Sequence, residues 1–156
     1  MAQPCDIGPT IIEGLYIEAL VLTDETRAAF DGSVRKSAAG APDEDLARIA
    51  LSCEALRTTT RMMHALAWLL NQRAYFAGEL SEFQLRRHGR LPPAQPDGDP
   101  AERALLDPAV AELVTHTRRF YARIEQLDFA WSARFDLRPA AVHRLRERLG
   151  RAVAGL

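Results

Sequence analysis

The chain has 156 residues, of which 47% are hydrophobic and 26% charged, and its formal net charge is -1. This length predicts one domain, residues 1–156, that is large enough to bury a core, and the composition excludes a disordered chain. The small net charge argues against a protein that binds nucleic acid by bulk electrostatics. Residues 1–9 lack the positive start and apolar stretch of a signal peptide, so we expect a cytoplasmic protein.

The first periodic segment begins near Thr10, which forms a capping-box pattern with Glu13 three residues later. We expect a helix from Thr10 to about Phe30, ended by the Asp-Gly pair at Gly32. Residues 33–42 are small and polar without periodicity, which predicts a loop.

The second helix is expected to open at Pro42 and to contain the most apolar stretch of the chain, Leu56–Gly78. Rows of apolar or small side chains run along three sides of this stretch: Leu56, Thr60, Met63, Ala67, Leu70, Ala74 and Ala77; Met62, Leu66, Leu69 and Phe76; Trp68 and Tyr75. Such a helix packs on two partners of its own chain, or on one partner and on another subunit, and the pattern leaves both arrangements open. Polar residues interrupt the apolar run, so a membrane span is not expected.

The segment Gly89–Pro100 is rich in proline and glycine and predicts a long interhelical loop. Asp107 and Pro108 then match an N-cap followed by proline at the first helical position, and a third helix is expected to continue towards Pro139. A short basic helix or tail occupies residues 137–156. These elements predict an all-α fold: an antiparallel three-helix bundle with a long central helix, a core of about residues 10–135 and a short C-terminal helix.

Residues that carry catalysis are not apparent. The histidines His64, His88, His116 and His143 occur in no Glu-x-x-His or HExxH pattern, and the chain has no phosphate-binding glycine loop and no Gly-x-Ser-x-Gly. Cys53 lies on the apolar stripe, far from Cys5, and is expected to act as a small buried hydrophobe. We therefore expect no catalytic, cofactor-binding or metal-binding residues, and no enzyme.

Two surfaces are candidates for binding partners. The larger side chains of the central helix form a candidate protein interface: Met62, Trp68, Leu69, Arg73, Tyr75 and Phe76. The arginines near the long loop and in the last segment form a candidate basic contact surface: Arg86, Arg87, Arg90, Arg144 and Arg148. Exposed aromatic residues are not interleaved with these arginines, which favours a solvated face or an acidic protein partner over nucleic acid. Arg57 and Arg61 are expected to reach acidic residues of a neighbouring helix.

The central helix also carries a motif: Glu54-Ala55-Leu56-Arg57-x-Thr59-Thr60-Arg61-x-Met63, then Ala67-Trp68-Leu69-Leu70-x-Gln72-Arg73-Ala74 and Gly78-Glu79. It resembles the signature of an alphaproteobacterial family, DUF1465, which includes the regulator of CtrA degradation. The likeness extends to Leu15-Tyr16-x-Glu18-Ala19-Leu20 and to Tyr121-x-Arg123-Ile124-x-x-Leu127-Asp128.

The resemblance implies a three-helix bundle that tends to form a homodimer and has no catalytic activity. It further implies an adaptor that links substrates or accessory factors to the ClpXP protease in cell-cycle-dependent proteolysis. Its partners would be a protease subunit, a second adaptor or a response-regulator substrate. The alternatives are a scaffold homodimer with an unrelated role and, ranked last, a weak nucleic-acid-binding protein.

Overall fold

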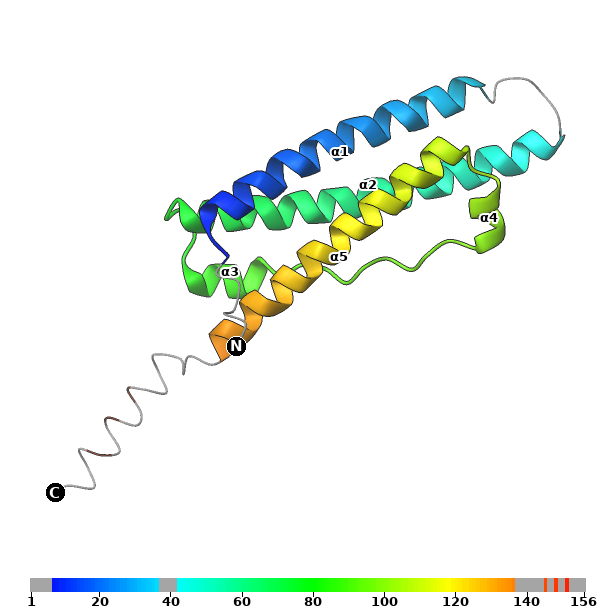
Figure 1. Ribbon diagram of the computed structural model, residues 1–156. Helices are drawn as coiled ribbons and strands as arrows, with labels where there is room; N and C mark the ends of the chain where they lie inside the picture. The colour runs from blue at the N-terminus through cyan, green and yellow to red at the C-terminus, as the bar shows by residue number, and fades with distance from the viewer. Residues whose placement is uncertain (1–6, 37–41, 137–144, 146–147, 149–150, 152–156) are drawn as a thin grey trace, which may run out of the picture.

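The computed structural model describes residues 7–36, 42–136, 145, 148 and 151. Its elements are all helices, as expected: α1 (Pro9–Lys36), α2 (Pro42–Phe76), α3 (Glu82–His88), α4 (Pro100–Ala104) and α5 (Pro108–Asp136). The long helices α1, α2 and α5 pack side by side as a bundle, whereas α3 and α4 are short and lie at its two ends (Figure 1). The expected three-helix architecture is therefore present.

The helix directions follow from the connections. α1 runs antiparallel to both α2 and α5, whereas α2 and α5 run in the same direction (Figure 1). Two hydrogen bonds between α2 and α5 agree with this parallel arrangement. Arg61 bonds to Thr117, and Trp68, which is later in α2, bonds to Asp128, which is later in α5. This differs from a fully antiparallel bundle because the connection after α3 returns the chain along the whole bundle before α5 begins.

The returning connection is extended and is fastened to the bundle by polar contacts. The Tyr121 hydroxyl donates a hydrogen bond to the Pro92 carbonyl at 2.5 Å, and Arg118 pairs with Asp97. α4 then begins at Pro100, and the Asp99 carboxylate accepts the Ala101 N–H. This N-cap was not among those predicted from the sequence.

Several helix ends follow the expected chemistry. The Asp107 carboxylate accepts the Ala109 N–H at 2.9 Å just as α5 starts. α2 ends before Gly78, whose φ of 77° lies in the left-handed region that glycine adopts without strain. Ser81 and Gln84 form a reciprocal capping box at the start of α3.

The first helix is longer than expected. The prediction that it ends at Asp31 and Gly32 is wrong, because α1 continues to Lys36. Phe30 packs with Val110 and Val114 of α5, so tertiary contact holds the end of α1 in place. Glycine inside a helix costs only about 1 kcal/mol relative to alanine, which such packing offsets.

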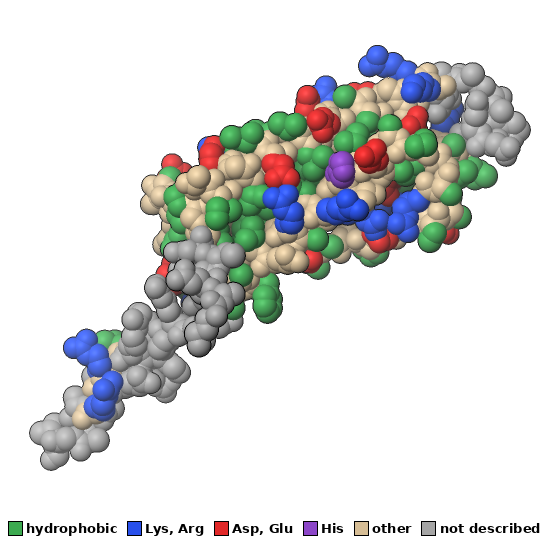
Figure 2. Space-filling view, viewed as in Figure 1, with side chains coloured by type: hydrophobic (Ala, Val, Ile, Leu, Met, Phe, Trp, Pro, Cys, Tyr) green, Lys and Arg blue, Asp and Glu red, His purple; other side chains and the backbone are tan. Residues whose placement is uncertain are grey.

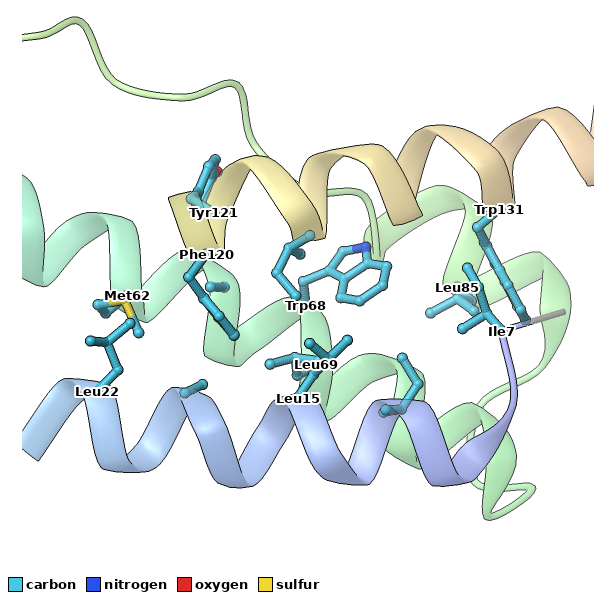
Figure 3. Close-up of a cluster of buried hydrophobic side chains, with 14 residues drawn as sticks. Ile7, Leu15, Leu22, Met62, Trp68, Leu69, Leu85, Phe120, Tyr121 and Trp131 are labelled. Carbon is cyan, nitrogen blue, oxygen red and sulfur yellow. The ribbon is translucent and has the colours of Figure 1, made fainter. Parts of the chain in front are cut away.

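The main core lies between the three long helices. Trp68 and Leu69 of α2, 1% and 0% exposed, pack with Phe120 and Ile124 of α5 and with residues of α1 (Figure 3). Ile7, which precedes α1, and Leu85 of α3 lie beside Trp131 and extend the core to the end of the bundle (Figure 3). The expected C-terminal helix falls mostly outside the described residues. In that segment Leu145, Arg148 and Arg151 are described as helical and exposed.

Candidate functional site: the outer face of α2

The interface predicted from the sequence lies largely inside the bundle. Met62, Trp68 and Leu69 are at most 2% exposed and pack within their own chain, so their assignment to an interface is wrong. A period of 3.6 residues shows which side chains share a face, but it does not show which face turns inward.

The other three predicted interface residues are half-buried and have partners in the same chain. Arg73 pairs with Glu13 at 2.8 Å, and its guanidinium stacks 4.3 Å from the Tyr16 ring centroid. Tyr75 and Phe76 make edge-to-face contacts with Trp131, with ring centroids 5.3 and 5.9 Å apart. These contacts fasten the end of α2 to α1 and α5.

The opposite face of α2 carries a mostly apolar row that is largely exposed in the described part of the chain. We call it the outer seam, and it consists of Leu46, Ile49, Cys53, Leu56, Thr60, Met63, Ala67, Leu70, Ala74 and Ala77. Leu56 and Met63 in its middle are 70% and 64% exposed. Cys53 is only half-buried there, rather than part of the core as expected. The α2 helix is therefore apolar on two opposite sides, of which the bundle uses one.

The polar residues of the sequence motif form a buried network between α2 and α5. The Arg61 guanidinium donates to the Thr117 hydroxyl at 2.9 Å and to the Thr58 hydroxyl at 3.3 Å, and it lies 3.8 Å from the Glu54 carboxylate. Burial lowers the pKa of the Arg61 guanidinium, and the Glu54 charge acts in the opposite direction. Arg57 joins the network to α4 through Glu102 at 3.5 Å.

A second buried contact connects the motif to α5 and to the long loop. The Trp68 indole N–H points towards α5 and donates to the Asp128 carboxylate at 2.8 Å (Figure 3). The same carboxylate accepts a hydrogen bond from Arg90 at 3.0 Å. Both networks are internal, so the motif residues named here position helices. Arg57 reaches Glu102 of α4, as expected. The same expectation is wrong for Arg61, whose acidic partner Glu54 belongs to its own helix and whose partner on α5 is Thr117.

The predicted basic surface is dispersed. Arg86 and Arg87 lie exposed on α3, Arg90 is engaged with Asp128, and Arg148 is exposed in the last segment. Arg144 lies outside the described residues. The arrangement gives no continuous basic stripe among the arginines whose positions are described.

A groove between α1 and α5 was not predicted. It has a volume of about 470 Å³, and its lining includes Val21, Glu25, His116, Arg119 and Phe120. Figure 2 shows charged side chains of both signs and a histidine along this face. Arg123 and Glu18 form an ion pair at 2.6 Å across it. The groove could have been predicted from the polar residues beside the apolar stripes of α1 and α5, such as Glu25 and Arg119.

The chemistry of the described residues adds two observations. Within the described ranges, no three His, Cys, Asp or Glu side chains are grouped so that they would hold a metal ion. No described helix is both long enough and apolar enough to cross a membrane.

Comparison with known proteins places the chain in a family. No curated protein and no solved structure matches it. The model of one protein family, described as a protein of unknown function (DUF1465), matches residues 5–153. This match spans nearly the whole chain and includes the motif of α2, and the protein therefore belongs to the DUF1465 family.

Proposed function

We propose that this protein is a non-enzymatic, protein-binding adaptor that links substrates or accessory factors to the ClpXP protease in regulated, cell-cycle-dependent proteolysis. The outer seam of α2 is the observation that supports protein binding in this proposal. It is a mostly apolar helix face about 45 Å long that is largely exposed in the described part of the chain. Contiguous exposed apolar surface of this kind is typical of protein interaction sites.

The link to proteolysis rests on the resemblance of the α2 motif to the family that includes the regulator of CtrA degradation. The contacts of two motif residues support the inference that this chain and its relatives share a surface. Arg61 and Trp68 are bound inside the bundle, so the motif specifies a helix packing that relatives with the same motif would share. A shared packing presents a similar outer face.

The proposal is tested by capture of partners from the native host. The tagged chain is crosslinked in cells, recovered, and analysed by mass spectrometry beside the double variant Leu56→Glu/Met63→Glu. The matched control is Phe129→Glu on α5, where the wild-type side chain is 74% exposed and lies outside the seam. Because all these positions are exposed, the substitutions leave the core intact.

We expect ClpX, ClpP or a response regulator to be enriched with the wild type and with Phe129→Glu, and to be reduced with the double variant. Recovery of the chain alone would refute the adaptor and favour a scaffold homodimer. Recovery of proteins that disappear after nuclease treatment would instead favour nucleic-acid binding.

A further inference from the structure

A small cavity lies at the end of the bundle where α2, α3 and α5 meet. It has a volume of about 140 Å³. Leu85 of α3 lies beside Trp131 of α5 at this end (Figure 3). Most of the residues that line the cavity have side chains that can form hydrogen bonds: Gln72, Arg86, Arg90, Asp128, Trp131 and Ser132. Polar groups from α2, α3, α5 and the connection after α3 therefore converge on one small space.

The side-chain amide of Gln72 is the feature of this cavity that points to a ligand. Gln72 is 1% exposed, and within the described part of the chain neither its amide nitrogen nor its amide oxygen has a hydrogen-bond partner. Buried amides are almost always hydrogen-bonded, because an amide without partners has given up the water that it binds in the unfolded chain. Since Gln72 lines the cavity, a molecule held there can accept from the amide N–H and donate to the amide oxygen.

The charges of the lining favour an anion. Arg86 and Arg90 contribute two positive charges and Asp128 one negative charge, which leaves a net charge of +1. The Asp128 carboxylate already accepts hydrogen bonds from Trp68 and from Arg90. Arg90 uses for this contact only one of the five N–H donors of a guanidinium. Arginine donors of this kind are the usual partners of phosphate and carboxylate groups in proteins.

We infer that this cavity binds a small oxyanion that also carries a hydroxyl group, of the type of hydrogen phosphate. The anionic oxygens accept from the arginines and from the Gln72 amide N–H, and the hydroxyl donates to the Gln72 amide oxygen. Sulfate has the same shape but no hydroxyl at neutral pH, so it leaves that amide oxygen without a donor. Cavities for larger organic ligands measure about 300–1,000 Å³, so a volume of about 140 Å³ selects a small ion. The inference does not depend on the proposed function.

The bound ion would hold α3 against the bundle, because its partners lie on α2, on α3 and on the connection after α3. A ligand that binds the folded chain also stabilises it by mass action. Phosphate should therefore slow amide hydrogen exchange in Glu82–His88 and raise the melting temperature. Phosphate and sulfate both stabilise proteins in general, so the comparison of the two anions separates the site from this salt effect.

The test is a fluorescence titration of the full chain with inorganic phosphate at neutral pH and constant ionic strength. The chain has two tryptophans, and both report on the site: Trp131 lines the cavity, and Trp68 donates to Asp128, which also lines it. Sulfate and chloride are titrated in parallel. We expect a saturable change with phosphate at millimolar concentrations, a weaker one with sulfate and none with chloride. No saturable change with phosphate, or an equal change with sulfate, would overturn the inference.

Three variants assign the response to the cavity. Gln72→Leu keeps most of the side-chain volume but removes the amide, and it should raise the dissociation constant for phosphate about tenfold or more. Without phosphate it should melt no lower than the wild type, because no unpaired amide is left buried. Arg86→Met, at an exposed position that leaves the core intact, should weaken binding by a similar factor.

The matched control is Arg87→Met, since Arg87 is the exposed neighbour on α3 and lies outside the lining. Its dissociation constant for phosphate should equal that of the wild type. Slower hydrogen exchange in α3 on addition of phosphate should likewise be seen in the wild type and in Arg87→Met, and be lost in Gln72→Leu. A phosphate response that survives both Gln72→Leu and Arg86→Met would place the ion elsewhere and overturn the inference.

Discussion

Replacement of Arg61 by methionine tests whether the motif stabilises the bundle. Methionine keeps most of the buried volume but removes the guanidinium that donates to Thr117 and Thr58 and pairs with Glu54. Glu54 is 4% exposed, and loss of one partner of a buried ion pair costs about 3–5 kcal/mol. Arg57 remains 3.5 Å from the Glu54 carboxylate, so we expect a loss near the lower end of this range, about 3 kcal/mol.

The assay is urea unfolding followed by helical circular dichroism, and the expected loss corresponds to a fall in melting temperature of about 6–12 °C. The control is Arg27→Met. Arg27 is also paired with an acid one turn away, but its side chain is 78% exposed, and its loss should change the free energy of unfolding by less than about 0.5 kcal/mol. The double variant Glu54→Leu/Arg61→Met should recover much of the loss, since no buried charge is left unpaired. A loss below about 1 kcal/mol for Arg61→Met, or a double variant less stable than Arg61→Met, would refute the reasoning.

Three further predictions concern single residues. Trp68→Phe should lower the free energy of unfolding by about 1–3 kcal/mol, because Asp128 loses a buried hydrogen bond, while the mass in solution at fixed concentration stays that of the wild type. A changed mass with an unchanged free energy of unfolding would restore Trp68 to an interface. Gly78→Ala should cost about 1 kcal/mol in thermal unfolding, since φ is 77° and open space surrounds the added methyl group; an unchanged melting temperature would show that the turn relaxes. Burial, followed by the charges of Glu125 and Asp128, raises the pKa of Tyr121 to about 12 from an ordinary 10.0. The unfolded chain loses the Tyr121 phenol proton at a lower pH than the folded chain does. The contribution of the protonated phenol to the free energy of unfolding is therefore complete below pH 10 and is lost progressively up to about pH 12, by at most about 3 kcal/mol. Tyr121→Phe should lack this alkaline loss in denaturant titrations, and an equal slope in both proteins would contradict the assignment.

The sequence by itself determined the helical class and the starts of α2 and α5, whereas the predicted cap Thr10 lies inside α1, which begins at Pro9. The spacing of apolar residues, the cap at Asp107 and the proline that begins α2 depend on local geometry, which a single chain segment fixes. The motif likewise indicated the family that the comparison with family models found. Local rules failed at Gly32, because packing of Phe30 on α5 extends α1 beyond a residue that often ends helices.

Only the tertiary structure decided which side of α2 faces the core. The inward and the outward side of α2 both carry rows of apolar side chains, and periodicity alone could assign either side to the core or to an interface. The choice was made by residues distant in sequence. Thr117 and Asp128 of α5 supply hydrogen-bond partners for Arg61 and Trp68, and a buried polar group needs such a partner. That requirement turns Arg61 and Trp68 inward and leaves Leu56 and Met63 of the outer seam exposed. The candidate interface predicted from the sequence was therefore on the wrong side of α2.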